Sequence, residues 1–510
     1  MHPFHHAAAQ PDTPAIIMAG SGQRLTYAEL EAESNRIAHL LRGLGLNRGD
    51  SIVIMMLNEI DFLPICWAAQ RAGLIYVAMS TKLTADEAGY IVTDSGARAI
   101  FCSPALAAVA VAATPGLAPA ARLCTGAGAP GCTPLMDAIA GLPATRIADE
   151  SSGRDMLYSS GTTGRPKGVR GALPEGPIDQ VDALTGMVAM LYKFGPGMMY
   201  LSPAPLYHAA PLRYCMSVHK FGGTVVVMEK FDPEAYLRLV EQYRITHSQL
   251  VPTMFVRMLK LPEDVRRAHD LSSLQVAIHA AAPCPVDVKH AMIAWWGPVI
   301  YEYYSATEGA GFTAISPQEW LERPGSVGKS ILGEIRILDD EGNRLGPNQV
   351  GQIFFHGGSS FSYHNDPEKT ASVMTEHGAT FGDIGRVDEE GYLFLTDRQA
   401  FMIISGGVNV YPQEAENTLI SHPEVADVAV FGIPDEVMGE AVHAVVQPRD
   451  MAKAGPDLEA ELLDYVRSRL SHVKCPKRID FRAELPRHDT GKLYKRLLKD
   501  EYWAAAAPGV

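Results

Sequence analysis

The chain has 510 residues, of which 47% are apolar and 20% charged, and it carries a net charge of −14. This composition is that of a globular protein and excludes a mostly disordered, collagen-like or coiled-coil chain. The negative charge argues against nucleic acid as the main partner, because proteins that bind nucleic acid phosphates carry broad basic surfaces.

The cysteines and the N-terminus indicate the cellular compartment. Seven cysteines are scattered along the chain without a CxxC pair, which favours reduced thiols and offers no zinc-finger spacing. The first fifteen residues lack the basic-then-apolar order of a signal peptide, and no run of about 18 apolar residues occurs. We therefore predict a soluble, cytoplasmic protein. His2, His5 and His6 are expected on a frayed terminus and are not predicted to bind a metal.

Strand and helix patterns alternate over the first 300 residues. Thr26 and Glu29 form a capping-box pattern at the start of a predicted helix that ends near residue 43. The apolar run 51–57 predicts a buried strand, and a helix over 60–72 and a second strand over 73–79 follow. This order predicts βαβ units in a parallel sheet. The same patterns recur at 99–102, 223–228, 233–243, 275–280 and 285–296.

The pattern changes after about residue 330. Short strand-like runs separated by turns predict a β-rich subdomain, at 334–338, 352–356 and 392–396. Beyond residue 398, predicted helices at 412–421 and 458–471 alternate with strands at 425–431 and 441–447. These last elements span about 110 residues, which is enough for a separate α+β domain. The predicted fold class is therefore α/β, with a large N-terminal domain of parallel-type sheets and a smaller C-terminal domain.

The strongest candidate for a binding site is the segment Tyr158–Val169, YSSGTTGRPKGV. Its glycines let backbone amides approach an anion, and its hydroxyl groups and Lys167 add donors and positive charge. A triphosphate or pyrophosphate requires such a loop. It is not a Walker A loop, because Arg165 and Pro166 separate the lysine from the preceding glycine. A plain solvated loop is the alternative.

Two further segments carry groups that suit a nucleotide. Tyr303–Gly309, YYSATEG, follows a predicted strand over 298–302, and α/β proteins bind ligands at such strand ends. An aromatic ring there can stack on a base, and Glu308 can hold Mg²⁺. Asp383, in FGDIGR, can accept the hydroxyls of a ribose, although Gly-Asp pairs also favour ordinary turns.

The sequence evidence is weaker for His208 and for the basic segment 474–499. His208, in LYHAAPL, is the histidine that we favour for function, although a lone histidine is more often structural. Residues 474–499 contain nine lysines and arginines against three acidic residues. That run is either a solvated basic tail or a segment in which Lys492, after Thr490 and Gly491, reaches an active site from a mobile loop.

Six segments in this order resemble the motifs of the adenylate-forming superfamily: YSSGTTGRPKGV, LYHAAPL, YYSATEG, FGDIGRVDEEGYLFLTDR, ISGGVNVYPQEAE and PRHDTGKLYK. The superfamily comprises acyl-CoA synthetases, adenylation domains of peptide synthetases and luciferases, and the resemblance covers essentially the whole chain. It implies an AMP-forming ligase that joins a hydrophobic carboxylic acid (fatty, aromatic or alicyclic) to CoA through an acyl-adenylate. ATP, Mg²⁺ and CoA are the implied cofactors and co-substrates, and a monomer or homodimer is the implied assembly. Two alternatives stay open, a stand-alone adenylation enzyme that loads a carrier protein or stops at the adenylate, and a non-catalytic nucleotide-binding homologue.

The resemblance also implies a role for particular residues. The loop would hold the ATP phosphates, through Ser159, Ser160, Gly161, Thr162, Thr163, Gly164 and Lys167. Adenine would lie between Tyr304 and a wall containing Ala281 and Ala282, the ribose against Asp383 and Arg398, the α-phosphate at Thr307, and Mg²⁺ at Glu308. The implied catalytic residues are Lys492, Glu308, Thr163 and His208. Ala400 would be the hinge between a large domain, 1–399, and a small mobile domain, 400–510, whose Gly406 and Gly407 would enter the site in the thioester step.

Overall fold

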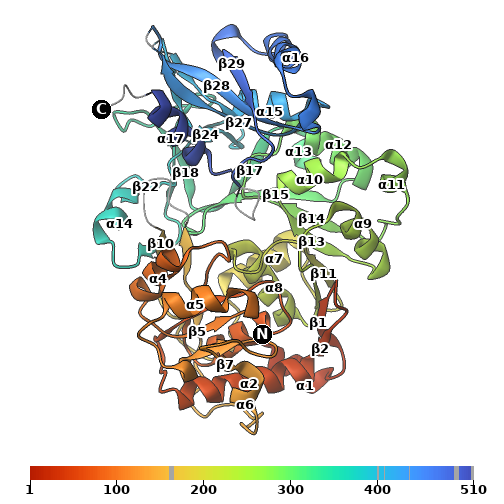
Figure 1. The fold of residues 1–510 in the computed structure, drawn as a ribbon, viewed down its shortest axis with the longest axis vertical. Helices are drawn as coiled ribbons and strands as arrows, with labels where there is room; N and C mark the ends of the chain where they lie inside the picture. Colours follow the sequence, from red (N-terminus) through yellow and green to blue (C-terminus); the bar gives the residue numbers. More distant parts are fainter. Residues whose placement is uncertain (160–165, 399–400, 407, 436, 488–492, 507–510) are drawn as a thin grey trace.

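The computed structural model describes the chain except for residues 160–165, 399–400, 407, 436, 488–492 and 507–510. In Figure 1 the N-terminal elements, in red and orange, form the lower part of the molecule and the C-terminal elements, in blue, form the upper part. Strands β13 (His247–Leu250), β14 (Val276–His279) and β15 (Ile300–Ser305) lie between them. The α/β fold class, with a large N-terminal domain and a C-terminal domain, is confirmed.

The first sheet has six strands in the order β7-β6-β5-β3-β4-β8, all of them parallel. The predicted strand over 51–57 is β3, and all five of its residues are buried, as expected for a strand with both faces covered. The strands are β3 (Ser51–Met55), β4 (Ile75–Ala78), β5 (Ala97–Cys102), β6 (Arg122–Cys124), β7 (Thr133–Pro134) and β8 (Arg154–Asp155). The helices of this part are α2 (Tyr27–Gly43), α3 (Phe62–Arg71), α4 (Ala85–Asp94), α5 (Ala107–Ala113) and α6 (Leu135–Ile139).

The second sheet has fifteen strands and changes character at β15. From β1 (Pro14–Met18) through β12 (Thr224–Val227), β11 (Met199–Ser202), β13, β14 and β15 the neighbouring strands are parallel. Beyond β15 the pairs are antiparallel, which is the predicted β-rich part; its strands are β16 (Phe312–Ile315), β17 (Ser326–Leu332), β18 (Glu334–Leu338), β19 (Gly351–His356), β21 (Met374–Thr375), β22 (Gly378–Ala379), β23 (Asp383–Val387) and β24 (Leu393–Arg398). Strand β2 (Arg24–Thr26) pairs with β1 at the other edge.

Helices connect the strands of this sheet. They are α7 (Ala183–Tyr192), α8 (Ala209–Phe221), α9 (Pro233–Gln242), α10 (Pro252–Leu259), α11 (Glu263–Arg267), α12 (Val286–Trp296), α13 (Pro317–Glu322) and α14 (Pro367–Val373). Beside the sheet lies a small three-stranded one, β20-β10-β9, made of β9 (Leu157–Ser159), β10 (Lys167–Arg170) and β20 (Ser362–Tyr363).

The C-terminal elements form their own five-stranded sheet, with its own buried apolar cluster. Its strands are β25 (Ile403–Ser405), β26 (Val408–Val410), β27 (Val425–Asp435), β28 (Gly439–Pro448) and β29 (Arg478–Phe481). Its helices are α15 (Gln413–Ile420), α16 (Pro456–Arg467) and α17 (Lys495–Ala506). The helix predicted to reach residue 471 therefore ends four residues earlier. The predicted boundary at residues 399 and 400 lies outside the described residues.

The capping-box prediction is confirmed. The Thr26 side chain accepts a hydrogen bond from the Glu29 amide, and the Glu29 carboxylate accepts one from the Thr26 amide. Helix α2 begins at the next residue, because these two bonds satisfy amides that have no partner inside the helix.

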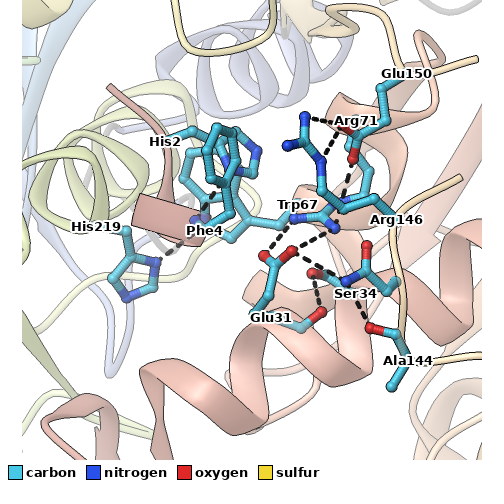
Figure 2. A network of polar contacts seen from close by, with 11 residues as sticks. His2, Phe4, Glu31, Ser34, Trp67, Arg71, Ala144, Arg146, Glu150 and His219 are labelled. Carbon is cyan, nitrogen blue, oxygen red and sulfur yellow. Dashed lines mark hydrogen bonds and ion pairs between the residues drawn. The ribbon is translucent and has the colours of Figure 1, made fainter. Parts of the chain in front are cut away.

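The prediction of a frayed N-terminus is wrong. Residues Pro3–Ala9 form helix α1, and His2 is fully buried, with its ring 4.9 Å from the ring of Trp67 (Figure 2). The Trp67 indole donates to Nδ1 of His219, whose Nε2 lies 3.0 Å from the Ala15 carbonyl oxygen. Burial of His2 and its edge-to-face contact with Trp67 therefore order a segment that the sequence alone predicts to be frayed.

Candidate active site

A cavity of about 2910 Å³ lies at the carboxyl ends of the parallel strands of the large sheet. The segments that follow five neighbouring strands all contribute to its lining. They are residues 203–205 after β11, 229–231 after β12, 251–254 after β13, 281–283 after β14 and 306–309 after β15. Ligand sites of open α/β sheets occur at this edge, because the connections there converge around one crevice.

The predicted adenine and ribose residues lie together in this cavity. The Tyr304 hydroxyl donates to Oδ2 of Asp383 at 2.6 Å. Asp383 pairs with Arg398 in the antiparallel register of β23 and β24, so their backbones are adjacent, although the Arg398 side chain lies outside the described structure. Ala281 and Ala282 also line the cavity.

Two details of this region differ from expectation. Tyr303 and Tyr304 do not follow a strand but belong to one, because β15 continues to Ser305 by pairing with β16. Ala281 has a φ of +76°, which places a residue with a Cβ in the left-handed region. That conformation costs about 1–2 kcal/mol for residues other than glycine, and such strain is found at ligand sites.

The segment predicted to bind phosphate is flanked by β9 and β10, which pair antiparallel with Ser159 opposite Lys167. Ser160, Gly161, Thr162, Thr163 and Gly164 lie outside the described residues, as does the side chain of Ser159. Lys167 lines the cavity, and its Nζ lies 3.4 Å from Oδ2 of Asp366. Lys167, the first residue of β10, therefore lies at the cavity.

Glu308 and Thr307 lie in the connection after β15 and line the same cavity. Oε1 of Glu308 accepts a hydrogen bond from the Tyr363 hydroxyl at 2.8 Å. Burial, together with the nearby Glu308, raises the pKa of Tyr363, so its hydroxyl stays a donor. A cavity-lining carboxylate of this kind would fit Mg²⁺ if substrate phosphates bound next to it, because Mg²⁺ is usually held by one or two carboxylates together with such phosphates. Among the described residues, no group of three His, Cys, Asp or Glu side chains is placed to hold a metal without such help.

Three aromatic side chains line the same cavity as the residues predicted to bind the nucleotide, and we call them the aromatic pocket: Tyr214, Tyr303 and Phe312. The ring of Tyr303 stacks on Phe312 with centroids 4.9 Å apart, and Tyr214 stacks on Tyr303 at 6.2 Å. Burial raises the pKa of Tyr303 to about 12, so the ring is neutral. His208, the residue before α8, also lines the cavity. The pocket therefore offers aromatic surface to an apolar group.

An ion pair between Arg213 and Asp155 is among those that face the same cavity. Arg213 donates to Oδ2 of Asp155 at 2.7 Å, and both residues line the cavity. Burial alone would raise the pKa of Asp155, but Arg213 keeps it below its usual value. The sequence did not predict this pair, because the two residues are 58 positions apart and Asp155 lies in no recognisable motif.

Behind Ala280–Pro283 lies a buried cluster that the sequence did not reveal as such. We call Lys289, Glu302 and His279 the wall cluster. Nζ of Lys289 lies 2.5 Å from Oε2 of Glu302, and Nε2 of His279 lies 3.3 Å from the same oxygen. Burial would raise the pKa of Glu302, but Lys289 and His279 lower it to about 2. The cluster thus joins β14, β15 and α12, and His279 directly precedes Ala280 in the chain.

The C-terminal domain closes one side of the cavity. Arg487 and residues 493–497 line it, and these flank Lys492, which itself lies outside the described residues. Nζ of Lys495 lies 2.8 Å from Oε1 of the buried Glu416. The Gly406 amide donates to the Met438 carbonyl at 2.8 Å in a turn that does not belong to the cavity lining. Ala400 and Gly407 fall outside the described residues, so the hinge and the roles of Gly406, Gly407 and Lys492 stay predictions.

Comparison with protein families matches two models to this chain. The model described as AMP-binding enzyme matches residues 4–363, and the model described as AMP-binding enzyme C-terminal domain matches residues 414–492. Together they span both parts of the fold. In the described part of the chain, every helix is too short or too polar to cross a membrane.

Two curated relatives match over nearly the whole chain. A long-chain-fatty-acid–CoA ligase of Mycobacterium tuberculosis is 30% identical over 503 residues, which cover 98% of this chain and 97% of the relative. A feruloyl-CoA synthase of an Amycolatopsis species is 33% identical over 502 residues, covering 97% of this chain and 96% of the relative.

Two solved structures of similar sequence also share the fold of this chain. The o-succinylbenzoate CoA synthetase of Bacillus subtilis, in complex with its acyl-adenylate intermediate, has a TM-score of 0.80 at 26% identity and covers 98% of this chain and 97% of its own. An amide bond synthetase of Marinactinospora thermotolerans has a TM-score of 0.81 at 28% identity, covering 96% and 97%.

Proposed function

The chain belongs to the AMP-binding enzyme family of the adenylate-forming superfamily, and from this premise we propose that it activates a hydrophobic carboxylic acid with ATP and transfers the acyl group to CoA. It is an AMP-forming acid–thiol ligase. The proposed acid is fatty, aromatic or alicyclic.

The observation that carries this proposal is the single cavity in which nucleotide-binding groups and an aromatic pocket meet. Tyr304 and Asp383 mark the nucleoside end, Lys167 and Glu308 the phosphate end, and Tyr303 with its stacked neighbours the apolar end. A carboxylate bound against the aromatic rings would point its charged end at the α-phosphate. Proximity of this kind converts a slow bimolecular reaction into an effectively unimolecular one.

The proposed chemistry has two steps. An oxygen of the carboxylate attacks the α-phosphorus of ATP, the bond to the β-phosphate oxygen breaks, and pyrophosphate leaves. The thiol of CoA then attacks the acyl carbon, loses its proton, and AMP leaves with the electron pair. Lys167 and Lys492 would neutralise negative charge that develops in the first step. Mg²⁺ bound at Glu308 would further screen the phosphate charge.

The two alternatives differ from this proposal in the molecule that accepts the acyl group and in whether the protein is a catalyst at all. A carrier protein bearing a phosphopantetheine thiol would enter the same site as CoA and would leave the first step unchanged. A non-catalytic homologue would bind ATP and release no pyrophosphate.

The deciding experiment measures pyrophosphate release from ATP and Mg²⁺ with a panel of fatty, aromatic and alicyclic acids, each with and without CoA. We expect one acid class to give CoA-dependent turnover with AMP and the acyl-CoA as products. Pyrophosphate release that does not depend on CoA would favour the carrier-protein acceptor. ATP binding without any pyrophosphate release across the panel would contradict the proposal.

The role of Lys492 can be tested by separating the two half-reactions. We expect Lys492→Ala to slow adenylate formation by on the order of 10²–10³-fold, the usual cost of removing one charge-stabilising group. Thioester formation from a supplied acyl-adenylate should change little. Lys499→Ala is the matched control, because Lys499 lies in the same tail and pairs with Glu440 at 3.2 Å instead of lining the cavity. Equal losses in both half-reactions would contradict the assignment.

A further inference from the structure

Tyr363 is a residue that the sequence motifs did not single out, and it lies beside the two charged groups of the phosphate end. It is the last residue of β20, which pairs antiparallel with β10, with Tyr363 opposite Val169. Strand β10 begins with Lys167, directly after the glycine-rich loop. The small sheet therefore places Tyr363 two positions away from the loop lysine on the neighbouring strand.

The tyrosine contacts both charged side chains. Its hydroxyl donates to Oε1 of Glu308 at 2.8 Å, and Nζ of Lys167 lies 5.6 Å from the centre of its ring. The first contact is a hydrogen bond to a charged acceptor, and the second is within the range of a cation–π interaction. Tyr363 thus contacts the Glu308 carboxylate through its hydroxyl group and the Lys167 ammonium through the face of its ring.

The backbone and ring of Tyr363 are themselves held in place. The Tyr363 amide donates to Oγ1 of Thr370 at 2.9 Å. The Thr370 hydroxyl in turn donates to the Asp366 carbonyl, at the start of α14, at 2.8 Å. The ring meets Phe361 edge to face, with centroids 5.4 Å apart. Strand pairing, a helix start and an aromatic contact therefore fix the position of the hydroxyl.

We propose that Tyr363 is a positioning residue for Glu308: its hydroxyl holds one carboxylate oxygen so that the other faces the magnesium complex of ATP. This inference rests on the proposed function, since it assigns a task to a residue of that same site. A carboxylate without such a donor would sample several rotamers and could pair directly with Lys167. Donors that orient a metal-binding side chain change metal affinity by about 10–100-fold when they are removed.

The test uses Tyr363→Phe, which removes the hydroxyl and keeps the ring. Tyr392→Phe is the matched control, because the Tyr392 hydroxyl also donates to a glutamate, Glu319, at 3.2 Å, and Tyr392 does not line the cavity. ATP binding is measured by calorimetry with Mg²⁺, with Mn²⁺ and with EDTA, and thermal melting verifies that each variant is folded.

We expect Tyr363→Phe to weaken ATP binding in the presence of Mg²⁺ or Mn²⁺ by about 10–100-fold and to leave binding in EDTA unchanged. Tyr392→Phe should match the wild type under all three conditions. Equal affinities of Tyr363→Phe and the wild type, or an equal loss with and without the cation, would overturn the inference.

A second variant shows whether Tyr363 acts through the carboxylate. In a Glu308→Gln background, Tyr363→Phe should have no further effect on cation-dependent ATP binding, because the group that it orients is already lost. Additive losses would contradict the proposal. A wild type that releases no pyrophosphate with any acid would instead refute the proposed function, so the two failures are distinguishable.

Discussion

The network under α1 and the wall cluster both bury charge inside the large domain, but they distribute it differently. Under α1, Arg71 has no exposed surface and pairs with Glu31 and Glu150, and Glu150 also pairs with Arg146 (Figure 2). In the wall cluster, one carboxylate, Glu302, serves both Lys289 and His279. The first arrangement shares charge among four groups, and the second depends on a single oxygen.

His219 and His279 differ in the number of their hydrogen-bond partners. His219 has a hydrogen-bond partner at each ring nitrogen, the Trp67 indole and the Ala15 carbonyl. His279 makes no hydrogen bond within the described residues, although Nε2 lies 3.3 Å from Glu302. His219 is therefore satisfied at both ring nitrogens and His279 at neither. The network under α1 nevertheless also contains buried side-chain atoms without a hydrogen-bond partner among the described residues, among them Nε2 of His2 and Nε of Arg71.

The largest expected effect comes from Lys289→Met. This change leaves Glu302 buried without its cation, and breaking a buried ion pair on one side costs about 3–5 kcal/mol. Arg71→Met should cost less, because Glu150 keeps Arg146 and the Glu31 side chain is 16% exposed. Urea unfolding at pH 7 compares the two variants.

A double variant sharpens this comparison. Adding Glu302→Gln to Lys289→Met removes the stranded charge and should recover a large part of the lost stability. Equal destabilisation by Arg71→Met and Lys289→Met would contradict the idea that the number of charge partners sets the cost of losing one. Failure of the double variant to recover stability would contradict it as well.

A change of pH tests the N-terminal region. Burial lowers the pKa of His219 from an ordinary value near 6.5 to about 4, so the folded protein binds fewer protons than the unfolded chain between these values. Stability from this group is complete above pH 6.5 and is lost as the pH falls toward 4. We expect about 2 kcal/mol of loss at pH 5 relative to pH 7 from this residue.

The variant His219→Gln isolates that contribution, because glutamine can both accept from Trp67 and donate to the Ala15 carbonyl. The difference in unfolding free energy between pH 7 and pH 5 should be about 2 kcal/mol smaller in the variant than in the wild type. An identical pH dependence of the two proteins would show that His219 does not couple folding to protonation.

The smallest expected effect concerns strain at the nucleotide site. Ala281→Gly should stabilise the protein by about 0.5–1 kcal/mol, because glycine adopts a positive φ without steric cost while gaining freedom in the unfolded state. Ala282→Gly, the neighbouring control with no positive φ, should destabilise it by about 0.5–1 kcal/mol. Thermal melting measures both, and the same sign of change at the two positions would contradict the interpretation of strain.

Local sequence determined the elements whose stabilising contacts are close in the chain. Thr26 and Glu29 begin α2 because their reciprocal hydrogen bonds span three residues. The strands β3, β4, β12 and β14 are fully buried, and their apolar runs predicted this because hydrophobicity and its period can be seen within a short segment. Six motifs in order were also sufficient to indicate the adenylate-forming superfamily, with which the family models agree.

Only the tertiary structure decided the contacts between groups that are distant in the chain. Tyr304 meets Asp383 across 79 positions, Tyr363 meets Glu308 across 55, and Arg213 meets Asp155 across 58. The extension of β15 through Tyr303 and Tyr304 depends on its pairing with β16, and the order of α1 depends on the packing of His2 against Trp67. Pairing and burial of this kind arise only when separate segments are brought together, and no local pattern records which segments these are. The sequence therefore determined the reaction class and the main candidate residues, and the packing of the sheets decided how those residues are held.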